Sequence, residues 1–285
     1  MPAMMSSTSV GLCGLANEES FRLRILAIVK QVPDSNAAIK VLPDGSGIDF
    51  TGLKLVPDPF DEFGIELAVQ LREKRSDVTE IVALTLGSEK ASEALRVALA
   101  MGADVGVHIN DPKLESKDEV FAAYVIAEAV KKLGDGFDLI LCGKYNIDLD
   151  AGAVGPALAE FLDLPHVGAV TALDIAPDGK RFTARRRIEG AEEVVECDLP
   201  ALLTIEKGLV EPRYPSLPNL MKAKKKPVTV MSTAELPGLE ALSAGVRFES
   251  ISPPPPRPDC KFIDGEPPQM AKELVRLLQQ EAKVL

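Results

Sequence analysis

Short apolar runs alternate with amphipathic segments along the first half of the chain. The runs are rich in branched residues and end at turn signals, which is typical of buried strands. They stand at 24–30, 80–86, 104–109 and 137–143. In the segments that follow, apolar residues recur at spacings of three and four, as Phe60, Phe63 and Leu67 do, which predicts helices. The predicted helices begin at Asp58, Ser88, Asp118 and Gly152, and the last three end at Met101, Leu133 and Leu162.

Strands that alternate with helices predict crossover connections and hence an α/β fold with a doubly wound, mostly parallel sheet. After Val167 the pattern changes to strand-like segments joined by short turns, which predicts an antiparallel addition. These segments stand at 170–176, 181–190, 192–197 and 201–206. We also expect two short strands around the turn Pro43-Asp44-Gly45 and a last helix over Met270–Ala282.

The chain divides into four parts on this pattern. Residues 1–22 are small, polar and unpatterned, which predicts a disordered extension. Residues 23–210 form the α/β domain, and residues 211–227 form a segment rich in proline and lysine, the proline–lysine segment. Residues 228–285 hold too few apolar side chains for a core of their own, so we expect a C-terminal arm that packs on another surface.

Composition narrows the function classes. Among 285 residues, 32 lysines and arginines face 43 acids, and the net charge of −11 argues against nucleic-acid binding. No apolar stretch reaches the roughly 18–20 residues that cross a bilayer, so we expect a soluble protein without membrane insertion. The four cysteines are scattered and the two histidines lie far apart, which predicts free thiols in the cytoplasm and no metal site. No motif offers a catalytic nucleophile, which favours a carrier or binding protein.

The loop from Gly143 to Gly155 is the strongest candidate for a binding site. It follows a predicted strand and enters a helix whose first turn is almost all small residues, which suits a phosphate on exposed backbone N–H groups. A tight strand-to-helix turn without any ligand would have the same sequence, so both interpretations stay open. Asp148 and Asp150 would accept hydrogen bonds from ribose hydroxyls or cap the helix. The loop matches neither the P-loop nor the dinucleotide fingerprint.

The proline–lysine segment gathers four lysines in an acidic protein. A lysine run is most often a solvated face, and charge alone favours that interpretation. This run, however, follows three prolines and several apolar residues. A stiff loop with an apolar tip beside positive charge suits docking to an acidic partner.

Six ordered stretches resemble the beta (small) subunit of electron-transfer flavoproteins, over essentially all of 24–285. They read RILAIVKQVPD, DPFDEFGIELAVQLREK, ALRVALAMGAD, GKYNIDLDAGAVG, ARRRIEGAEEVVECDLPALLT and EPRYPSLPNLMKAKKKP. The resemblance implies a sheet of the adenine-nucleotide-binding type and a heterodimer in which a larger alpha subunit holds most of a redox-active FAD. It implies that this chain binds AMP or a second FAD and performs no bond chemistry. Electrons would pass from flavin dehydrogenases, such as acyl-CoA dehydrogenases, to a quinone reductase or similar acceptor.

The same resemblance assigns roles to residues. It places the nucleotide against Ile28, Asp58, Pro59, Phe60, Asp61, Leu86, Gly143, Lys144, Ile147, Asp148, Asp150, Ala151, Gly152, Ala153 and Val154. It assigns partner docking to Glu211, Arg213, Tyr214, Leu217, Pro218, Lys222 and Lys225, with Leu217 as the apolar anchor. It implies that the arm packs on the larger subunit. The family usually has Asn-Pro where this chain has Asp58-Pro59, and a polar group near Ala153.

Two alternatives remain. An electron-bifurcating member of the same family would carry a second FAD in this subunit, and the C-terminal run from Gly265 favours that form. A stand-alone nucleotide-binding stress-type protein would use the same sheet. That protein would be a monomer without flavin, and it would leave the proline–lysine segment and the arm without a role.

Overall fold

The computed structural model describes residues 22–111, 118–134, 136–239, 243–246, 248–257 and 259–285. The chain divides into two compact units. The larger unit runs to Ile39 and from Asp49 to Glu249, and the smaller comprises Lys40–Ile48 and Ser250–Leu285. The predicted disordered extension lies outside the described residues, except for Arg22.

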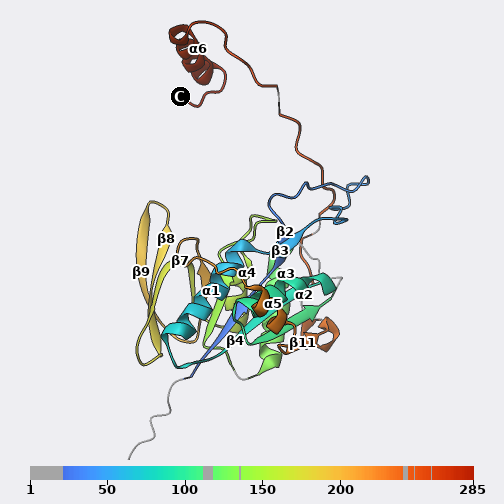
Figure 1. Ribbon diagram of the computed structural model, residues 1–285, viewed down its shortest axis with the longest axis vertical. Helices are drawn as coiled ribbons and strands as arrows, with labels where there is room; N and C mark the ends of the chain where they lie inside the picture. Colours follow the sequence, from blue (N-terminus) through green and yellow to red (C-terminus); the bar gives the residue numbers. More distant parts are fainter. Residues whose placement is uncertain (1–21, 112–117, 135, 240–242, 247, 258) are drawn as a thin grey trace, which may run out of the picture. The chain divides into compact units, whose positions relative to one another are not determined.

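A nine-stranded sheet, built from described residues, forms the centre of the larger unit (Figure 1). Its strands are β1 (Leu23–Ile28), β4 (Val78–Gly87), β5 (Val105–Asn110), β6 (Leu139–Gly143), β7 (His166–Ile175), β8 (Arg181–Ile188), β9 (Ala191–Asp198), β10 (Ala201–Ile205) and β11 (Val228–Met231). Their order is β11-β5-β4-β1-β6-β10-β7-β8-β9. Every neighbouring pair from β11 to β7 is parallel, whereas β8 runs antiparallel to both β7 and β9. The predicted α/β class with a mostly parallel sheet and an antiparallel addition is confirmed.

Helices cover both faces of this sheet. They are α1 (Pro59–Lys74), α2 (Ser92–Met101), α3 (Glu119–Leu133), α4 (Val154–Leu162) and α5 (Leu217–Ala223), with the short 3-10 helices η1 (Glu89–Ala91) and η3 (Thr233–Glu235). One hydrophobic core lies under α1, α2 and α5, and a second lies under α3 and α4. Successive side chains of β1 alternate between the two cores, since Ile25 and Ala27 join the first while Leu26 and Ile28 join the second. A strand buried in this way needs apolar residues on both faces, which explains the continuous apolar run.

The order of the sheet reverses at β1. This strand pairs with β4 on one side and with β6 on the other, so the chain winds outward from it in both directions. Sheets of this class bind ligands outside the carboxyl ends of their strands, at such a switch point. A binding site is therefore expected at the segments that leave β1 and β6.

Two segments lie elsewhere than the sequence pattern predicts. Ala201–Ile205, expected in the antiparallel addition, forms β10 between β6 and β7 and runs parallel to both. All of its residues are buried, because a central parallel strand is covered on both faces. Val228–Met231, expected at the start of the arm, forms β11 and pairs with β5 at the edge of the sheet.

Local details also differ. Residues 40–48 form a single bridge between Val41 and Ile48 rather than two strands. An antiparallel pair forms instead from β2 (Gln31–Pro33) and β3 (Leu55–Pro57). Ser88 does not cap α2 directly, because η1 stands between them. Helix α4 begins at Val154, two residues later than expected.

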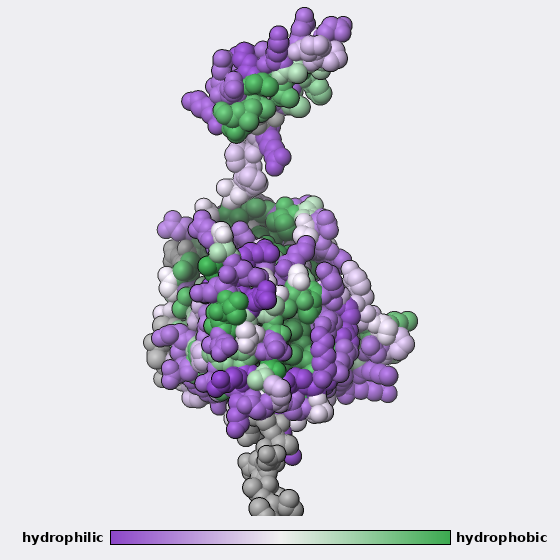
Figure 2. All heavy atoms as spheres, turned by 90° about the vertical axis from the view of Figure 1, so that its left-hand side faces the viewer, coloured by the Kyte–Doolittle hydropathy of each residue, from purple (hydrophilic) through white to green (hydrophobic). Residues whose placement is uncertain are grey.

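The smaller unit carries the terminal helix α6 (Pro267–Gln280), which begins three residues before the predicted start. Met270, Leu274 and Val275 are partly exposed on it. Figure 2 shows an apolar patch on this helix beside polar side chains, as expected for an amphipathic helix. Among the described residues, no helix has the length and apolar character needed to cross a membrane.

Candidate functional site

A pocket opens at the switch point of the sheet. Its walls come from the end of β1, the first turn of α1 and the loop that joins β6 to α4. They are Ile28, Lys30, Asp61, Cys142, Gly143, Lys144, Tyr145, Asn146, Ala151, Gly152, Val154 and Gly155.

Two buried aspartates at the start of α1 hold the walls together. Asp58 caps the first turn of α1 and also accepts a hydrogen bond from the Ile147 N–H at 2.8 Å. Asp61 accepts hydrogen bonds from the N–H groups of Lys30 at 2.7 Å and Gly143 at 2.9 Å. Because each carboxylate bridges separate segments, the pair fixes the ends of β1 and β6 against α1.

Burial changes the pKa values of these groups. Burial, reinforced by the nearby charge of Asp58 and opposed by two N–H bonds, raises the pKa of Asp61 to about 8. Burial also raises the pKa of Asp58, against the hydrogen bonds it accepts. Burial and the charge of Asp61 raise the pKa of the Cys142 thiol, which makes it a packing residue rather than a reactive thiolate. This side of the pocket disfavours additional negative charge.

Both lysines of the pocket are already paired. The Lys30 ammonium lies 2.7 Å from a carboxylate oxygen of Asp148, and the Lys144 ammonium lies 2.6 Å from one of Glu206. Burial by itself would raise the pKa of Glu206, but the hydrogen bond from Lys144 holds it below its ordinary value. The two cations are thus neutralised by the protein itself.

Glycines of the loop are required by the protein's own packing. A Cβ at Gly152 would lie 2.7 Å from the carbonyl oxygen of Lys144, and one at Gly155 would lie 2.4 Å from Cγ2 of Thr204. A Cβ at Gly143 would come within 2.7 Å of the first turn of α1. These residues let the loop approach the scaffold, so their small size alone does not indicate a bound phosphate.

A carboxylate already meets the N-terminus of α4. Glu119, at the start of α3, accepts a hydrogen bond from the Ala153 N–H at 2.8 Å and, with its other oxygen, one from the Asn146 amide. Asn146 also accepts a hydrogen bond from the Leu149 N–H at 3.1 Å and pairs with Ala151 across the loop. The sequence pattern carries no signal for the role of Glu119, because Glu119 and Ala153 lie 34 residues apart.

The residues predicted to contact a nucleotide fall into three groups. One group lines the pocket: Ile28, Asp61, Gly143, Lys144, Ala151, Gly152 and Val154. A second group holds the walls from behind: Asp58, Phe60, Ile147, Asp148 and Ala153. A third group does not line the pocket: Pro59 and Asp150 are exposed, and Leu86 packs against the core under α3. No group of His, Cys, Asp and Glu side chains in the described parts of the chain is arranged to hold a metal ion.

The proline–lysine segment presents an exposed surface around the short helix α5. Most residues predicted for docking are exposed: Glu211, Tyr214, Leu217, Pro218, Lys222 and Lys225. The apolar side chains are the unusual ones, since Tyr214, Leu217 and Met221 are 98%, 73% and 57% exposed. Single exposed apolar residues are ordinary, but a group of them beside lysines indicates an interaction surface.

Arg213 differs from the other residues predicted for docking, because its guanidinium binds α1. It donates to the two carboxylate oxygens of Glu66 at 2.8 and 2.9 Å and to those of Glu73 at 2.7 and 3.1 Å. Burial by itself would raise the pKa of Glu66. Hydrogen bonds from Arg213 and Gln70 outweigh burial and hold this pKa below its ordinary value. Arg213 therefore anchors the beginning of the segment.

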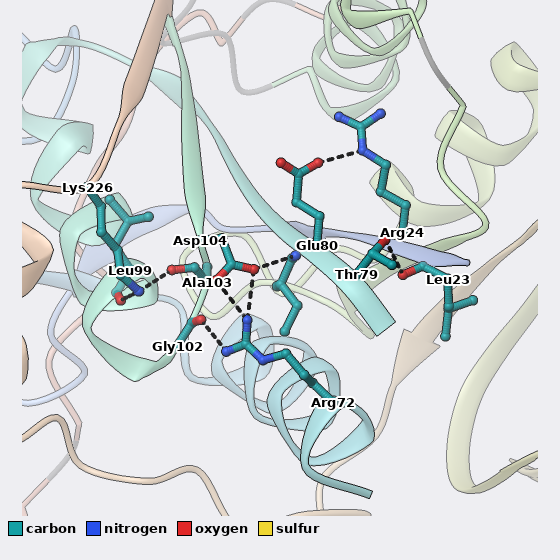
Figure 3. Close-up of polar contacts among 11 residues, drawn as sticks. Leu23, Arg24, Arg72, Thr79, Glu80, Leu99, Gly102, Ala103, Asp104 and Lys226 are labelled. Carbon is teal, nitrogen blue, oxygen red and sulfur yellow. Dashed lines mark hydrogen bonds and ion pairs between the residues drawn. The ribbon is translucent and has the colours of Figure 1, made fainter. Parts of the chain in front are cut away.

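Lys226 anchors the end of the same segment (Figure 3). Its ammonium donates to the carbonyl oxygens of Leu99 at 2.9 Å and Ala103 at 2.5 Å, where the C-terminus of α2 favours a cation. Burial lowers the pKa of Lys226. The neighbouring Asp104 binds Arg72 of α1 at 2.8 Å, so α1, α2 and the segment share one polar network.

Comparisons with known proteins point to one family. Residues 48–236 match the family model described as Electron transfer flavoprotein domain. The electron transfer flavoprotein subunit beta of Bacillus subtilis (strain 168) is 39% identical over 266 residues, which cover 92% of this chain and 100% of that protein. The proteins of the same description from Syntrophomonas wolfei and Homo sapiens are both 38% identical, over 92% and 82% of this chain and 98% and 90% of theirs.

Proposed function

The chain belongs to the electron-transfer flavoprotein family, and we propose that it acts as the beta-type subunit of a heterodimer with a larger alpha subunit. FAD, held mainly by the larger subunit, supplies the electron-transfer chemistry between flavin dehydrogenases, such as acyl-CoA dehydrogenases, and a quinone reductase or similar acceptor. This chain contributes a docking surface, a nucleotide pocket and a C-terminal arm.

The anchored, exposed surface around α5 is the observation that carries the docking role. Its two ends are fixed to α1 and α2 by Arg213 and Lys226, so little conformational freedom is lost when a partner binds. Leu217 offers an apolar side chain that is 73% exposed, and Lys222 and Lys225 stand near it in sequence. Such a surface suits a partner that has an apolar pocket for Leu217, surrounded by acidic side chains that face the lysines.

Replacing Leu217 by alanine tests this role. We expect Leu217→Ala to slow reduction of the flavin by an acyl-CoA dehydrogenase about tenfold or more at subsaturating concentration, because truncating an interface anchor costs about 2 kcal/mol. FAD content should stay unchanged. Val120→Ala, which truncates a partly exposed residue on α3, is the matched control. Unchanged kinetics in Leu217→Ala would remove the docking assignment.

The pocket supports a nucleotide through its position and its mixed walls. It lies at the switch point of the sheet, where ligands of this fold class bind. Ile28, Cys142 and Val154 offer apolar surface, and the loop backbone offers polar groups. These features fit the base and sugar of an adenine nucleotide better than its phosphate, since both lysines and the N-terminus of α4 already have carboxylate partners.

The nucleotides released by denaturing the purified heterodimer identify the ligand. One FAD with one AMP supports the ordinary carrier, whereas two FAD support the bifurcating form. A single FAD, together with no binding of added adenosine or AMP, would rule out a nucleotide pocket in this chain.

The arm is proposed to pack on the larger subunit. The observation that supports this role is α6, whose apolar residues Met270, Leu274 and Val275 are 37%, 48% and 46% exposed. Deleting residues 266–285 should weaken co-purification of the larger subunit while the sheet of this chain stays folded. Retention of an unchanged heterodimer would contradict the proposal.

A further inference from the structure

The N-terminus of α4 is where a phosphate would find free backbone N–H groups. The first N–H groups of any α-helix lack partners within the helix, and they attract anions. Ala153 stands between Gly152 and Val154, which both line the pocket. Its N–H already donates to Glu119 at 2.8 Å, and the second oxygen of that carboxylate accepts from the Asn146 amide.

The remaining charges near the pocket do not favour a second anion. Lys30 and Lys144 are paired with carboxylates at 2.7 and 2.6 Å. Asp58 and Asp61 are buried at the start of α1, beside the same loop. A phosphate would therefore have to displace a carboxylate, break a lysine pair, or lie near carboxyl groups whose raised pKa values show that this side of the pocket disfavours negative charge.

We propose that Glu119 serves as a built-in anion for the N-terminus of α4 and makes the pocket select the nucleoside part of a ligand over its phosphate. The inference rests on the proposed nucleotide pocket and specifies which part of the nucleotide that pocket recognises. Glu119 supplies one acceptor oxygen to the Ala153 N–H and the other to the Asn146 amide, so it holds the loop without a phosphate. A phosphate gains the Ala153 N–H only by expelling Glu119, and elsewhere at the N-terminus of α4 it would lie beside that carboxylate, whereas adenosine does not compete with it.

The test compares adenosine with AMP as ligands of the full-length chain in its heterodimer, after bound nucleotides have been removed. Isothermal titration of the wild type should give dissociation constants for adenosine and AMP that agree within about threefold, since both lysines that line the pocket already have carboxylate partners. Glu119→Gln removes the charge and keeps the shape, so AMP should bind about tenfold more tightly and adenosine should change by less than twofold. Glu160→Gln, which changes an exposed carboxylate on α4, should behave like the wild type.

The outcomes separate this inference from the proposed pocket. Wild-type binding of AMP at least tenfold tighter than adenosine would overturn the role of Glu119 while leaving the pocket intact. The role of Glu119 would also be overturned if the ratio of the AMP and adenosine dissociation constants were the same in Glu119→Gln as in the wild type. Absence of binding for both ligands would overturn the nucleotide pocket itself. The wild-type comparison needs no variant, so the inference stays testable even if Glu119→Gln does not fold.

Discussion

Arg213→Ala is the sharpest test of how the proline–lysine segment is attached. The substitution removes the guanidinium that binds Glu66 and Glu73, whose side chains are 3% and 55% exposed. The exposed pair with Glu73 contributes about 0–1 kcal/mol. Glu66 matters more, because its carboxylate would stay buried without its cation.

The magnitude follows from this burial. Stranding a fully buried charge costs about 3–5 kcal/mol. The Arg213 side chain is itself 36% exposed, so water can reach Glu66 once the guanidinium is gone, and Gln70 keeps its hydrogen bond to the carboxylate. We therefore expect a loss of about 2 kcal/mol in the free energy of unfolding, or roughly 4–8 °C in Tm.

Chemical denaturation at several pH values measures this loss. The bonds from Arg213 hold the pKa of Glu66 below its ordinary value, so their contribution is present above the unfolded-state pKa. It is lost as the pH falls through the folded-state pKa. The difference between the wild type and Arg213→Ala should therefore be largest near neutral pH and shrink in acid.

Two variants complete the design. Adding Glu66→Gln to Arg213→Ala should recover more than half of the loss, because it removes the stranded charge. Arg181→Ala breaks an exposed pair with Asp198 at 3.8 Å and should cost less than about 0.5 kcal/mol. An Arg213→Ala loss as small as that of Arg181→Ala, or a double variant without recovery, would refute the reasoning.

Two further predictions concern the pocket. Gly155→Ala should destabilise the chain by about 1–3 kcal/mol in urea unfolding, because its Cβ would lie 2.4 Å from Cγ2 of Thr204. Gly136→Ala is the control, since a Cβ at Gly136 would meet open space. Equal losses of stability in the two variants would contradict the packing argument. Burial raises the pKa of Asp61 to about 8, above its unfolded value, so this group stabilises the fold at low pH and the contribution is lost as the pH rises through 8. Between pH 5 and 8 the free energy of unfolding should decline less steeply in Asp61→Asn than in the wild type. Equal slopes in the two proteins would contradict the raised pKa of Asp61.

The chain's local pattern predicts much of this fold. The Asp58-Pro59 cap, the apolar spacing of α1 and the continuous run of β1 each depend on neighbours a few residues away, so they are visible in sequence. The loop at 143–155 could be picked out for the same reason, since it joins a strand to a helix rich in small residues. The exposed tip at Leu217 was also predictable, because prolines and lysines surround it.

Partners that lie far apart in sequence were not predictable. β10 looks like one more strand of a meander, and only the assembled sheet inserts it between β6 and β7. Arg213 looks like one more docking residue, yet it meets Glu66 across 147 positions. Val228–Met231 is too short and too isolated to indicate which edge of the sheet it joins.

The fold class, the family and the two segments proposed to carry function could be predicted from the sequence, because short-range periodicity and ordered motifs encode them. The electrostatic character of the pocket, in contrast, could be read only from the folded chain. The sequence shows that Lys30, Lys144 and Glu119 are charged, but their effect on a ligand depends on partners that lie 118, 62 and 34 residues away. Coulomb energy depends on distance in space, and folding is what sets that distance.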